Sequence, residues 1–423
     1  MIARTLVSVL LGRLREGWIE VIDDAGHRRT FGPPGAPLRA TIRVHDDRFW
    51  RALGGGSLPL AECYADGGWD CDDLVTLVRI GAREMPRLDR LRAPLTPLRA
   101  ALTRVPRNTR RRSRRHIAAH YDLGNRLFEL FLDETLTYSC AIWEDSGQSL
   151  REAQEAKLER ICRKLELGPG DHLLEIGSGW GALAVHAAGR FGCRVTTTTI
   201  SEAQRAVAAR RVREAGLEER VTVVARDYRE LRGTFTKLAS IEMIEAVGWQ
   251  YFDTFFRHCS ELLAPDGLML LQAITIDDRA YEAEKAGRSF INQLIFPGGC
   301  LPSLEVIARA TARATDMRAV DLEDITAGYP ETLRRWRERF ATSAGRAAAL
   351  GYDERFRRLW ELYLCWCEGG FRERRIGDVQ LLLAKPRYRG SRVNMRSEMA
   401  SSSEAGPREA SFASASLPPG PST

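Results

Sequence analysis

The chain of 423 residues contains no apolar run that approaches the roughly 20 residues needed to cross a bilayer. Its nine cysteines lack the paired spacing of a disulfide framework and the ligand spacing of a metal site. Even Cys365 and Cys367 stand too close together for either pattern. These absences predict reduced thiols in a cytoplasmic protein without a metal site.

A small-residue cleavage site is also missing after the short apolar run of Met1 to Leu11. This segment is therefore expected to be an amphipathic first helix rather than a signal peptide. The composition, with 44% hydrophobic and 28% charged residues, is typical of a globular protein that buries a proper core. The length favours two domains, or one large domain with extensions.

The net charge of +7 gathers in one segment. Residues 104–115 hold seven arginines and no acidic residue, a composition that attracts nucleic acid or an anionic membrane surface. No aromatic side chains interleave with the arginines, which argues against single-stranded nucleic acid. We therefore expect peripheral docking on the inner face of the membrane and no nucleic-acid partner. A solvated linker between domains is the alternative interpretation.

The same basic segment, preceded by Pro94 and Pro97, also divides the chain. We predict an N-terminal lipid- and membrane-docking domain at 1–103, with alternating strands and then a helical part from Leu60 to Arg90. A basic linker at 104–115 and a catalytic domain at 116–386 follow. Residues 387–423 are rich in Ser, Ala, Pro and Gly and are predicted to form a disordered tail.

The most informative segment is residues 171–204, which reads as strand, glycine turn, helix and strand. Glycines at the head of a helix let a ligand approach backbone N–H groups closely. The spacing is G-x-G-x-G with Glu175 two residues before it, rather than the G-x-G-x-x-G of dinucleotide enzymes. The second strand also ends without the acidic residue expected for an NAD ribose. Both differences favour S-adenosylmethionine over NAD as the cofactor.

Strands alternate with helices through the rest of this domain. Ser149 and Glu152 form a capping box that opens a helix, and strands are predicted at 221–225, 238–243 and 268–275. The predicted fold class is α/β, with a doubly wound, mostly parallel sheet and a smaller N-terminal domain. Ligands of such sheets bind beyond the carboxyl ends of the strands, so Glu245 and Gln272 are expected beside the glycine turn.

Several motifs together resemble one family. HYDLGN, TYSCA, EIGSGWG, EMIEAVG, FPGG-LPS and YL-x3-E-x2-FR occur in the order seen in cyclopropane-fatty-acyl-phospholipid synthases and their mycolic acid relatives. The resemblance covers most of residues 116–385 and extends more weakly into 56–74. It implies a class I methyltransferase-like Rossmann fold and an S-adenosylmethionine-dependent enzyme. Its substrate would be the cis double bond of an unsaturated acyl chain in membrane phospholipid.

The resemblance also implies site residues. The cofactor residues would be Tyr138, Ser139, Glu175, Gly177, Gly179, Trp180, Gly181, Thr199, Ile200, Gln204, Asp227 and Tyr228. The catalytic residues would be Cys140, Glu245, Gln272, Ile274 and Tyr329, which match the positions that hold a bicarbonate ion, together with Cys367 near the acyl pocket.

This assignment agrees with the chemistry that the reaction needs. An alkene is a poor nucleophile, so the enzyme must hold it in line with a sulfonium methyl and exclude water. The carbocation that results would be stabilised by the rings of Tyr138, Trp143 and Tyr329. Bicarbonate, positioned by Glu245, would then remove a proton from the new methyl group and the cyclopropane ring would close.

One residue departs from the family's common pattern, which has histidine at the position of Gln272. An amide donates a hydrogen bond to an anion but cannot take up a proton. The substitution resembles relatives that stop at a methylene-branched chain, for which a flavin-dependent reductase would be a partner. The cyclopropane and the methylene branch therefore both remain open as products, and a homodimer is a further expectation.

Simpler interpretations of these residues also stand. Cys140 and Cys367 would be packing residues, and Glu245 would cap the next helix. Two other functions are a methyltransferase for a soluble small molecule and a binding module that has lost its chemistry. The apolar residues in 290–301 and 356–371 argue against the first, and the intact glycine loop, Glu245 and Tyr329 argue against the second.

Overall fold

The structure, a computed structural model, describes residues 2–92, 108–109, 112, 123–285 and 287–390. Most of the arginine-rich segment, the first three residues of HYDLGN and the tail from residue 391 lie outside this set. The predicted disorder of the tail therefore stays a prediction. Residues 1–387 form one compact unit, and the predicted domain boundaries within it also stay predictions.

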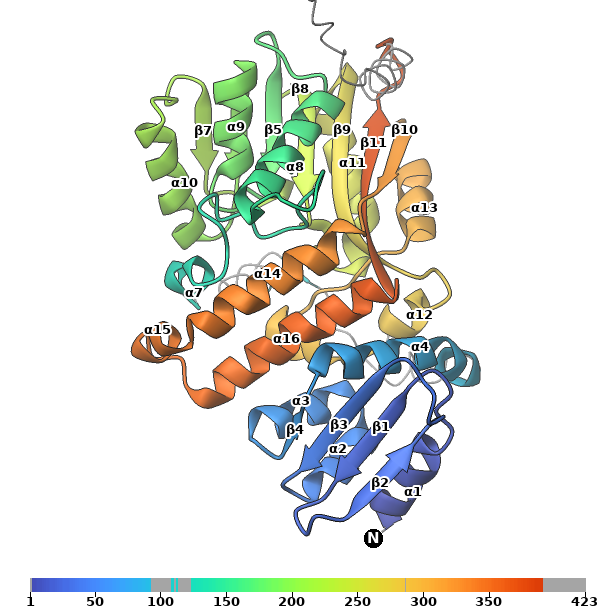
Figure 1. The fold of residues 1–423 in the computed structure, drawn as a ribbon. Coiled ribbons are helices and arrows are strands. Elements are labelled where there is room, and N and C mark those ends of the chain that lie inside the picture. The colour runs from blue at the N-terminus through green and yellow to red at the C-terminus, as the bar shows by residue number, and fades with distance from the viewer. Residues whose placement is uncertain (1, 93–107, 110–111, 113–122, 286, 391–423) are drawn as a thin grey trace, which may run out of the picture. The chain divides into compact units, whose positions relative to one another are not determined.

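The N-terminal part holds a four-stranded sheet in the order β2-β1-β3-β4 (Figure 1). In β3, residues Ala40, Ile42 and Val44 are buried while their neighbours are not, as expected for a strand with one covered face. The predicted helical part is interrupted, because β4 lies between two helices. The elements are α1 (Ile2–Leu11), β1 (Trp18–Ile22), β2 (Arg28–Phe31), β3 (Arg39–Val44), α2 (Arg48–Gly55), α3 (Ser57–Ala65), β4 (Trp69–Cys71) and α4 (Leu74–Arg92).

A seven-stranded sheet in the order β10-β11-β9-β8-β5-β6-β7 forms the second part. The five strands from β9 to β7 are parallel, and β11 and β10 are added antiparallel at the edge. This confirms the predicted doubly wound, mostly parallel sheet. The strands are β5 (His172–Ile176), β6 (Arg194–Thr198), β7 (Val221–Val224), β8 (Phe235–Ile241), β9 (Leu263–Ile276), β10 (Arg318–Asp324) and β11 (Ile376–Ala384).

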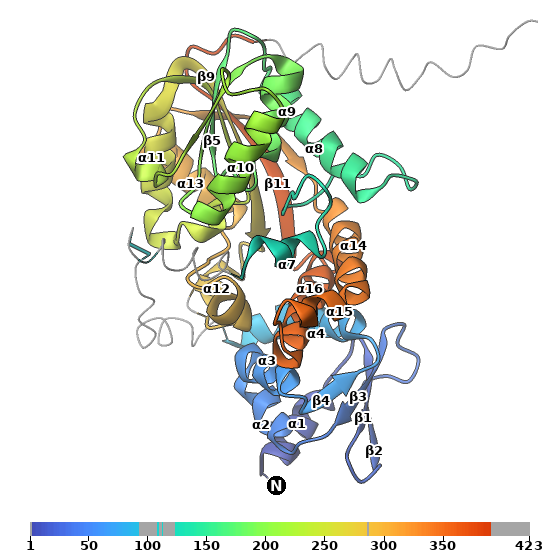
Figure 2. The ribbon, with the colours of Figure 1, turned by 90° about the vertical axis from the view of Figure 1, so that its left-hand side faces the viewer.

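Helices cover both faces of this sheet (Figure 2). α8 (Leu150–Lys164), α9 (Ala182–Phe191) and α10 (Glu202–Glu214) lie on one face, and α11 (Phe252–Leu262) and α13 (Leu304–Ala314) on the other. The predicted capping box is present, since Ser149 and Glu152 bond reciprocally at the start of α8. The remaining helices are α7 (Asn125–Glu129), η2 (Tyr228–Glu230), η3 (Ile244–Ala246), η4 (Trp249–Tyr251), α12 (Tyr281–Lys285), η5 (Ile291–Ile295), α14 (Gly328–Thr342), α15 (Ala344–Ala349) and α16 (Glu354–Arg372).

Two strand ends differ from the prediction. β8 ends at Ile241 instead of residue 243, so Glu242 and Met243 lie beyond the strand. β9 begins at Leu263, and its register with β8 jumps from Leu263 to Leu268, so the Pro265–Gly267 turn is an irregularity within one long strand. The first difference matters for the site, because it moves Glu242 from the sheet into the loop that follows.

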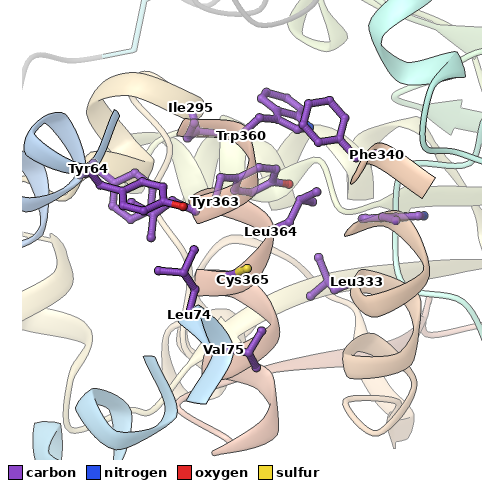
Figure 3. Close-up of a cluster of buried hydrophobic side chains, with 14 of the residues drawn as sticks. Tyr64, Leu74, Val75, Ile295, Leu333, Phe340, Trp360, Tyr363, Leu364 and Cys365 are labelled. Carbon is purple, nitrogen blue, oxygen red and sulfur yellow. The ribbon is translucent and has the colours of Figure 1, made fainter. Parts of the chain in front are cut away.

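Helix α16 joins the N-terminal part to the second part. It packs between α14 on one side and α3 and α4 on the other, with Leu364 and Cys365 among the buried apolar side chains there (Figure 3). Ion pairs support the contact: Arg358 of α16 bonds Asp70 at 2.7 Å, and Arg83 of α4 bonds Glu373 at 2.6 Å. Apolar residues of the N-terminal part are thereby held against a helix that also lines the site.

Candidate active site

One cavity of about 1040 Å³ opens at the carboxyl ends of β5, β6, β8 and β9. Gly177 and Gly179 follow β5, Thr199 and Ile200 follow β6, and Glu242 follows β8; all of them line this cavity. Parallel strands bring their carboxyl ends to one edge of the sheet, so residues far apart in sequence meet there. Among the predicted cofactor residues, only Gly181 does not line the cavity.

The glycine loop has the backbone that its sequence requires. Gly177, Gly179 and Gly181 have φ of 100°, 47° and 90°, a region that glycine adopts without steric cost. A Cβ on Gly179 would meet nothing within 4 Å, whereas one on Gly181 would lie 3.1 Å from Ala208 of α10. Gly181 therefore permits the close packing of α9 on α10, and Gly179 leaves room for a ligand at the start of α9, whereas a Cβ on Gly177 would lie 3.2 Å from the Met243 side chain.

Glu175 gives the cavity a site for a cation. Its side chain is buried and accepts a 2.5 Å hydrogen bond from the Thr197 hydroxyl, and burial raises its pKa to about 8. Among the residues that the structure describes, no Lys, Arg or His pairs with this carboxyl. A buried acid without a cationic partner suits a positively charged ligand group, such as the ammonium of the methionine part of S-adenosylmethionine.

The other predicted cofactor residues surround this acid. Thr199 donates to Gln204 at 2.9 Å, and the Asp227 carboxylate receives 2.8 and 2.7 Å hydrogen bonds from Arg229. Trp180 and Tyr228 are nearly fully buried and line the cavity with Ile200. The predicted residues thus form one continuous wall, and their chemistry fits the cofactor that the sequence indicates.

Tyr138 and Ser139 close this wall from the segment before α8. The Tyr138 hydroxyl shares a 2.6 Å hydrogen bond with the Tyr363 hydroxyl of α16. Ser139 accepts a hydrogen bond from Lys157, a buried lysine of α8 whose pKa burial lowers to about 8. Lys157 also lines the cavity, and the sequence analysis did not single it out.

Beyond Tyr138 the cavity is mostly apolar. Leu333 of α14, Leu362 and Trp366 of α16, and Phe296 line it there. Cys367 lies in the same wall, and burial raises the pKa of its thiol to about 12, so the side chain is a neutral, small apolar group. The N-terminal part contributes to the same cavity through Val7, Leu11, Ile19, Phe49, Leu74 and Leu77.

Three of the predicted ion-site residues do come together, but they bind the side chain of Glu242. Oε1 of Glu242 accepts hydrogen bonds from the main-chain N–H of Cys140 and from Nε2 of Gln272, both at 2.8 Å. Oε2 accepts one from the Tyr329 hydroxyl at 2.6 Å. The donors that were expected to hold bicarbonate already hold a carboxylate of the chain, so bicarbonate does not fit there in the way that the sequence implied.

Glu245 and Ile274 lie beside this cluster and line the cavity. Oε1 of Glu245 accepts from the main-chain N–H of Ile274 at 2.6 Å, so the side chain bonds the neighbouring strand and does not cap a helix. Burial, together with the nearby Glu242 carboxylate, raises the pKa of Glu245 to about 8. Its protonated form is therefore favoured at neutral pH.

Cys140 and Gln272 form the layer behind the cavity wall. Both side chains are fully buried and neither lines the cavity. The Cys140 thiol donates to main-chain carbonyls, at 3.3 Å to Ala141, so its side chain is a packing group and its N–H is the functional atom. Gln272 donates to Asp378 at 3.0 Å as well as to Glu242, and accepts from Gln380 at 3.1 Å.

Comparison with known proteins identifies the family. The family model of mycolic acid cyclopropane synthetase matches residues 108–381. The chain belongs to this family. It is 38% identical over 362 residues to a tuberculostearic acid methyltransferase of Mycobacterium tuberculosis, covering 82% of this chain and 84% of the relative. It is also 38% identical over 386 residues to the cyclopropane-fatty-acyl-phospholipid synthase of Escherichia coli, covering 89% and 96%.

Solved structures of the cyclopropane synthetase family agree with this assignment. The cyclopropane synthase MmaA2 of Mycobacterium tuberculosis matches with a TM-score of 0.61 and 31% identity, covering 64% of this chain and 98% of that chain. The mycolic acid cyclopropane synthase CmaA1, solved with SAH and CTAB, matches with a TM-score of 0.60 and 31% identity over the same shares. This cyclopropane synthetase family member is thus an S-adenosylmethionine-dependent methyltransferase.

Within this family member, the backbone at Glu242 is unusual. Its φ of 47° lies in the left-handed region, which costs a residue with a side chain about 1–3 kcal/mol. Its own N–H donates to the Gln272 carbonyl at 2.9 Å, which fixes the turn. The conformation directs the carboxylate toward three donors instead of along the strand, so the strain accompanies a specific placement of the side chain.

Two acids of the site, Glu242 and Asp378, and one lysine, Lys157, were not predicted from the sequence. Glu242 was placed inside a strand, although two acids three residues apart after an apolar run were a signal. Asp378 of β11 is fully buried, and burial and the Glu242 carboxylate raise its pKa well above its usual range. Trp143, in contrast, was expected at the cation but does not line the cavity; its Nε1 donates to Gly328 and Thr332.

The described residues show two further features. No helix among them is long and apolar enough to cross a membrane. No group of three or more His, Cys, Asp or Glu side chains among them is arranged to hold a metal ion.

Proposed function

We propose that this enzyme transfers the methyl carbon of S-adenosylmethionine to the cis double bond of an unsaturated acyl chain in a membrane phospholipid. The single observation that carries the proposal is the continuity of the cavity: one wall holds the cofactor residues around Glu175, and the remainder is mostly apolar, with a few charged side chains such as Arg87 and Arg375 in its lining. A polar metabolite would need more polar partners than this second region offers. The names of the two relatives, a fatty-acid methyltransferase and a fatty-acyl-phospholipid synthase, support the same substrate class.

The shape of the cavity also supports a long substrate. Its apolar lining runs from Phe296 and Leu333 to residues of the N-terminal part such as Phe49 and Leu74. A cavity of about 1040 Å³ exceeds the needs of the cofactor alone, because ligand sites are commonly about 300–1,000 Å³. An acyl chain extending into the N-terminal part would bury its apolar surface there and exclude water from the double bond.

The chemistry follows from this placement. S-adenosylmethionine, when bound, supplies an electrophilic methyl group on a sulfonium. Glu175 binds and orients the cofactor, and the apolar wall holds the alkene near the transferable methyl and excludes water. The ring of Tyr138 lines the cavity and packs on Trp336 at 5.3 Å, so it is held rigidly where it can stabilise a carbocation. Tyr329 stacks one ring face on Phe371 at 4.0 Å and is fixed in the same way.

The product that we propose first is the cyclopropane, formed when a proton leaves the new methyl group and the ring closes. A second product, the methylene-branched chain, is favoured by one observation. Gln272 bonds Glu242 through its amide, and an amide cannot take up the proton that a histidine at this position would accept. The tuberculostearic acid methyltransferase among the relatives is consistent with this second product. A flavin-dependent reductase would then be a partner.

Access to the substrate would come from docking on the inner face of the membrane. The net charge of +7 and the arginines of residues 104–115 support attraction to anionic lipids. Co-sedimentation with anionic and neutral vesicles at low and high salt tests this, because electrostatic docking weakens as salt screens the charges. Binding that ignores both salt and lipid charge would exclude electrostatic docking.

The test of the proposed reaction uses the full chain with S-adenosylmethionine and vesicles of a mono-unsaturated phospholipid. The fatty acids are then released and examined by NMR, because the two candidate products are isomers with equal mass. Upfield ring-proton signals identify the cyclopropane, and exocyclic methylene signals identify the branched product. Bound cofactor without any added carbon in the lipid would overturn the proposal.

A further inference from the structure

The carboxylate of Glu242 fills the place of an anion in the site. Three donors from three different elements point at it: the Cys140 N–H, the Gln272 amide and the Tyr329 hydroxyl, at 2.8, 2.8 and 2.6 Å. A carboxylate and a bicarbonate ion are both planar and singly negative, and both accept hydrogen bonds through oxygen. A site built for one can therefore hold the other, but not both on the same donors.

We propose that Glu242 is the catalytic base of this enzyme and takes the place of a bound bicarbonate ion. The proposal rests on the proposed function, because it names the group that accepts the proton lost after methyl transfer to the alkene. Glu242 lines the same cavity as the predicted cofactor residues. Glu245 also lines the cavity, but it accepts one hydrogen bond from another residue, the Ile274 N–H of β9, whereas Glu242 accepts three.

The hydrogen-bond donors of the site gather on Glu242 and not on the neighbouring acids. The titratable groups around it are Glu245, Asp378, Cys140, Lys157, Tyr329 and Tyr363. Burial raises the pKa of both other acids, Glu245 to about 8, so they favour the neutral form at neutral pH. Glu242 alone among the three acids receives three donors, and hydrogen bonds to the charged form stabilise it. Burial lowers the pKa of Lys157 to about 8, and the nearby Glu242 carboxylate acts in the opposite direction on that pKa.

The backbone conformation of Glu242 supports a specific placement of its carboxylate. Glu242 follows β8 in a left-handed conformation with φ of 47°, a position where glycine would be the unstrained residue. A glutamate there is strained, and its side chain is anchored at both oxygens. Strain of this kind persists only where surrounding contacts hold it, and it gathers at functional sites.

The π electron pair of the alkene forms the new bond to the methyl carbon, and the carbon–sulfur pair leaves on sulfur as S-adenosylhomocysteine. The cation left on the neighbouring chain carbon loses a proton from the transferred methyl to the Glu242 carboxylate. The C–H electron pair closes the three-membered ring. For the branched product, the hydrogen on the methylated carbon first moves as hydride to the neighbouring cationic carbon. The methyl group then loses its proton to Glu242, and the C–H electron pair forms the exocyclic double bond. The neutral Glu242 returns its proton to solvent after product release.

The experiment compares the full chain with the variants Glu242→Gln and Glu242→Gly in buffer depleted of carbon dioxide, with and without added bicarbonate. Product formation on mono-unsaturated phospholipid vesicles and binding of ¹³C-labelled bicarbonate by NMR are both measured. Glu218→Gln, an exposed acid outside the cavity, is the control for loss of one charge. Unfolding temperature and S-adenosylhomocysteine affinity show whether each variant is folded.

We expect wild type to work equally well with and without bicarbonate and to show no bicarbonate binding at this site. Glu242→Gln should lose about 100-fold or more in turnover, as expected when a general base is removed, with unchanged affinity for S-adenosylhomocysteine. Glu242→Gly keeps the three donors and relieves the strained backbone, so it should bind bicarbonate and regain at least about tenfold in rate when bicarbonate is added.

The proposal is overturned if wild type loses turnover in depleted buffer and regains it with bicarbonate, or if Glu242→Gln keeps its turnover. If the variants fail to fold, the bicarbonate dependence of wild-type turnover alone still tests whether the enzyme needs a bound bicarbonate ion. A wild type that makes no lipid product in either buffer contradicts the proposed function instead. The labelled-bicarbonate binding then still tests the site: binding by wild type overturns the inference, and binding by Glu242→Gly alone supports it.

Discussion

The hydroxyl of Tyr329, at the start of α14, donates a 2.6 Å hydrogen bond to the Glu242 carboxylate, 87 residues away at the end of β8. The Tyr329 ring is stacked on Phe371 of α16. Two helices from the last third of the chain therefore position a carboxylate in the loop that follows a central strand of the sheet. This relationship links the packing of α14 and α16 directly to the chemistry at the end of the strands.

Removing this hydroxyl should slow the reaction without lowering the affinity for the cofactor. Hydrogen bonds to charged groups contribute about 1.5–3 kcal/mol, so Tyr329→Phe should reduce turnover by about 10- to 100-fold. Affinity for S-adenosylhomocysteine should stay unchanged, because the bond is made to Glu242 and not to a cofactor residue. Tyr352→Phe, which removes a hydroxyl outside the cavity, is the matched control. A rate equal to wild type would show that the hydroxyl is only structural.

Glu175→Gln should lower the affinity for the cofactor and stabilise the protein without cofactor. The amide keeps the shape but cannot pair with a cation, so affinity for S-adenosylmethionine should fall by about 10- to 100-fold, measured by calorimetry. Wild-type affinity should rise with pH up to about 8, where the buried carboxyl ionises, and the variant should lack this rise. Affinity that is independent of pH in both proteins would contradict this role.

The stability effect of the same variant has the opposite sign. The folded protein holds the Glu175 proton more tightly than the unfolded chain, because burial raises the pKa from 4.5 to about 8. This stabilisation is complete below the unfolded pKa and is lost as pH rises toward 8. The neutral glutamine avoids the loss, so the variant without cofactor should unfold at a higher temperature than wild type at pH 8.

Gln272→His should change the reaction more than cofactor binding. Gln272 does not line the cavity, so affinity for S-adenosylhomocysteine should be unchanged. Its amide bonds Glu242, Asp378 and Gln380 together, and one imidazole cannot replace all three bonds. A stability loss of about 1–3 kcal/mol and a shifted pH profile or product ratio are expected, measured by denaturant unfolding and by NMR of the products. A large rise in the cofactor dissociation constant would place Gln272 among the cofactor residues.

Cys367→Phe should reduce the space available to the acyl chain of the substrate. The added ring would fill part of the apolar wall that Cys367 shares with Trp366 and Leu362. Turnover with long acyl chains should fall more than turnover with short ones, while cofactor affinity is kept. Cys367→Ala, which leaves the wall open, serves as the comparison and should act on both chain lengths equally. An equal loss for every chain length in Cys367→Phe would contradict a position along the chain.

Much of the fold could be predicted from local patterns. The glycine turn after Glu175, the capping box at Ser149 and the alternation of strands and helices each depend on nearby residues, and each is present in the structure. The interruption of the N-terminal helical part by β4 was not predicted, because a strand of three residues, Trp69–Cys71, gives too short a pattern.

The site was predicted as a set of residues and not as a set of contacts. Cys140, Gln272 and Tyr329 do meet, as the resemblance implied, but what they meet is Glu242. The sequence placed that acid inside β8, and a left-handed φ at a residue other than glycine has no local signal. The pairing of Gln272 with Asp378 likewise depends on the antiparallel register of β9 and β11, which sequence patterns alone do not determine.

The measurement that tests the central claim most directly follows a labelled methyl group. The full chain is incubated with S-adenosylmethionine carrying a ¹³C methyl and vesicles of a mono-unsaturated phospholipid, and the label is located by NMR in the released fatty acids and head groups. The account predicts label in the acyl chain at the former double bond, as a ring carbon or an exocyclic methylene. Label confined to another acceptor, or absent from the lipid while the cofactor binds, would contradict it.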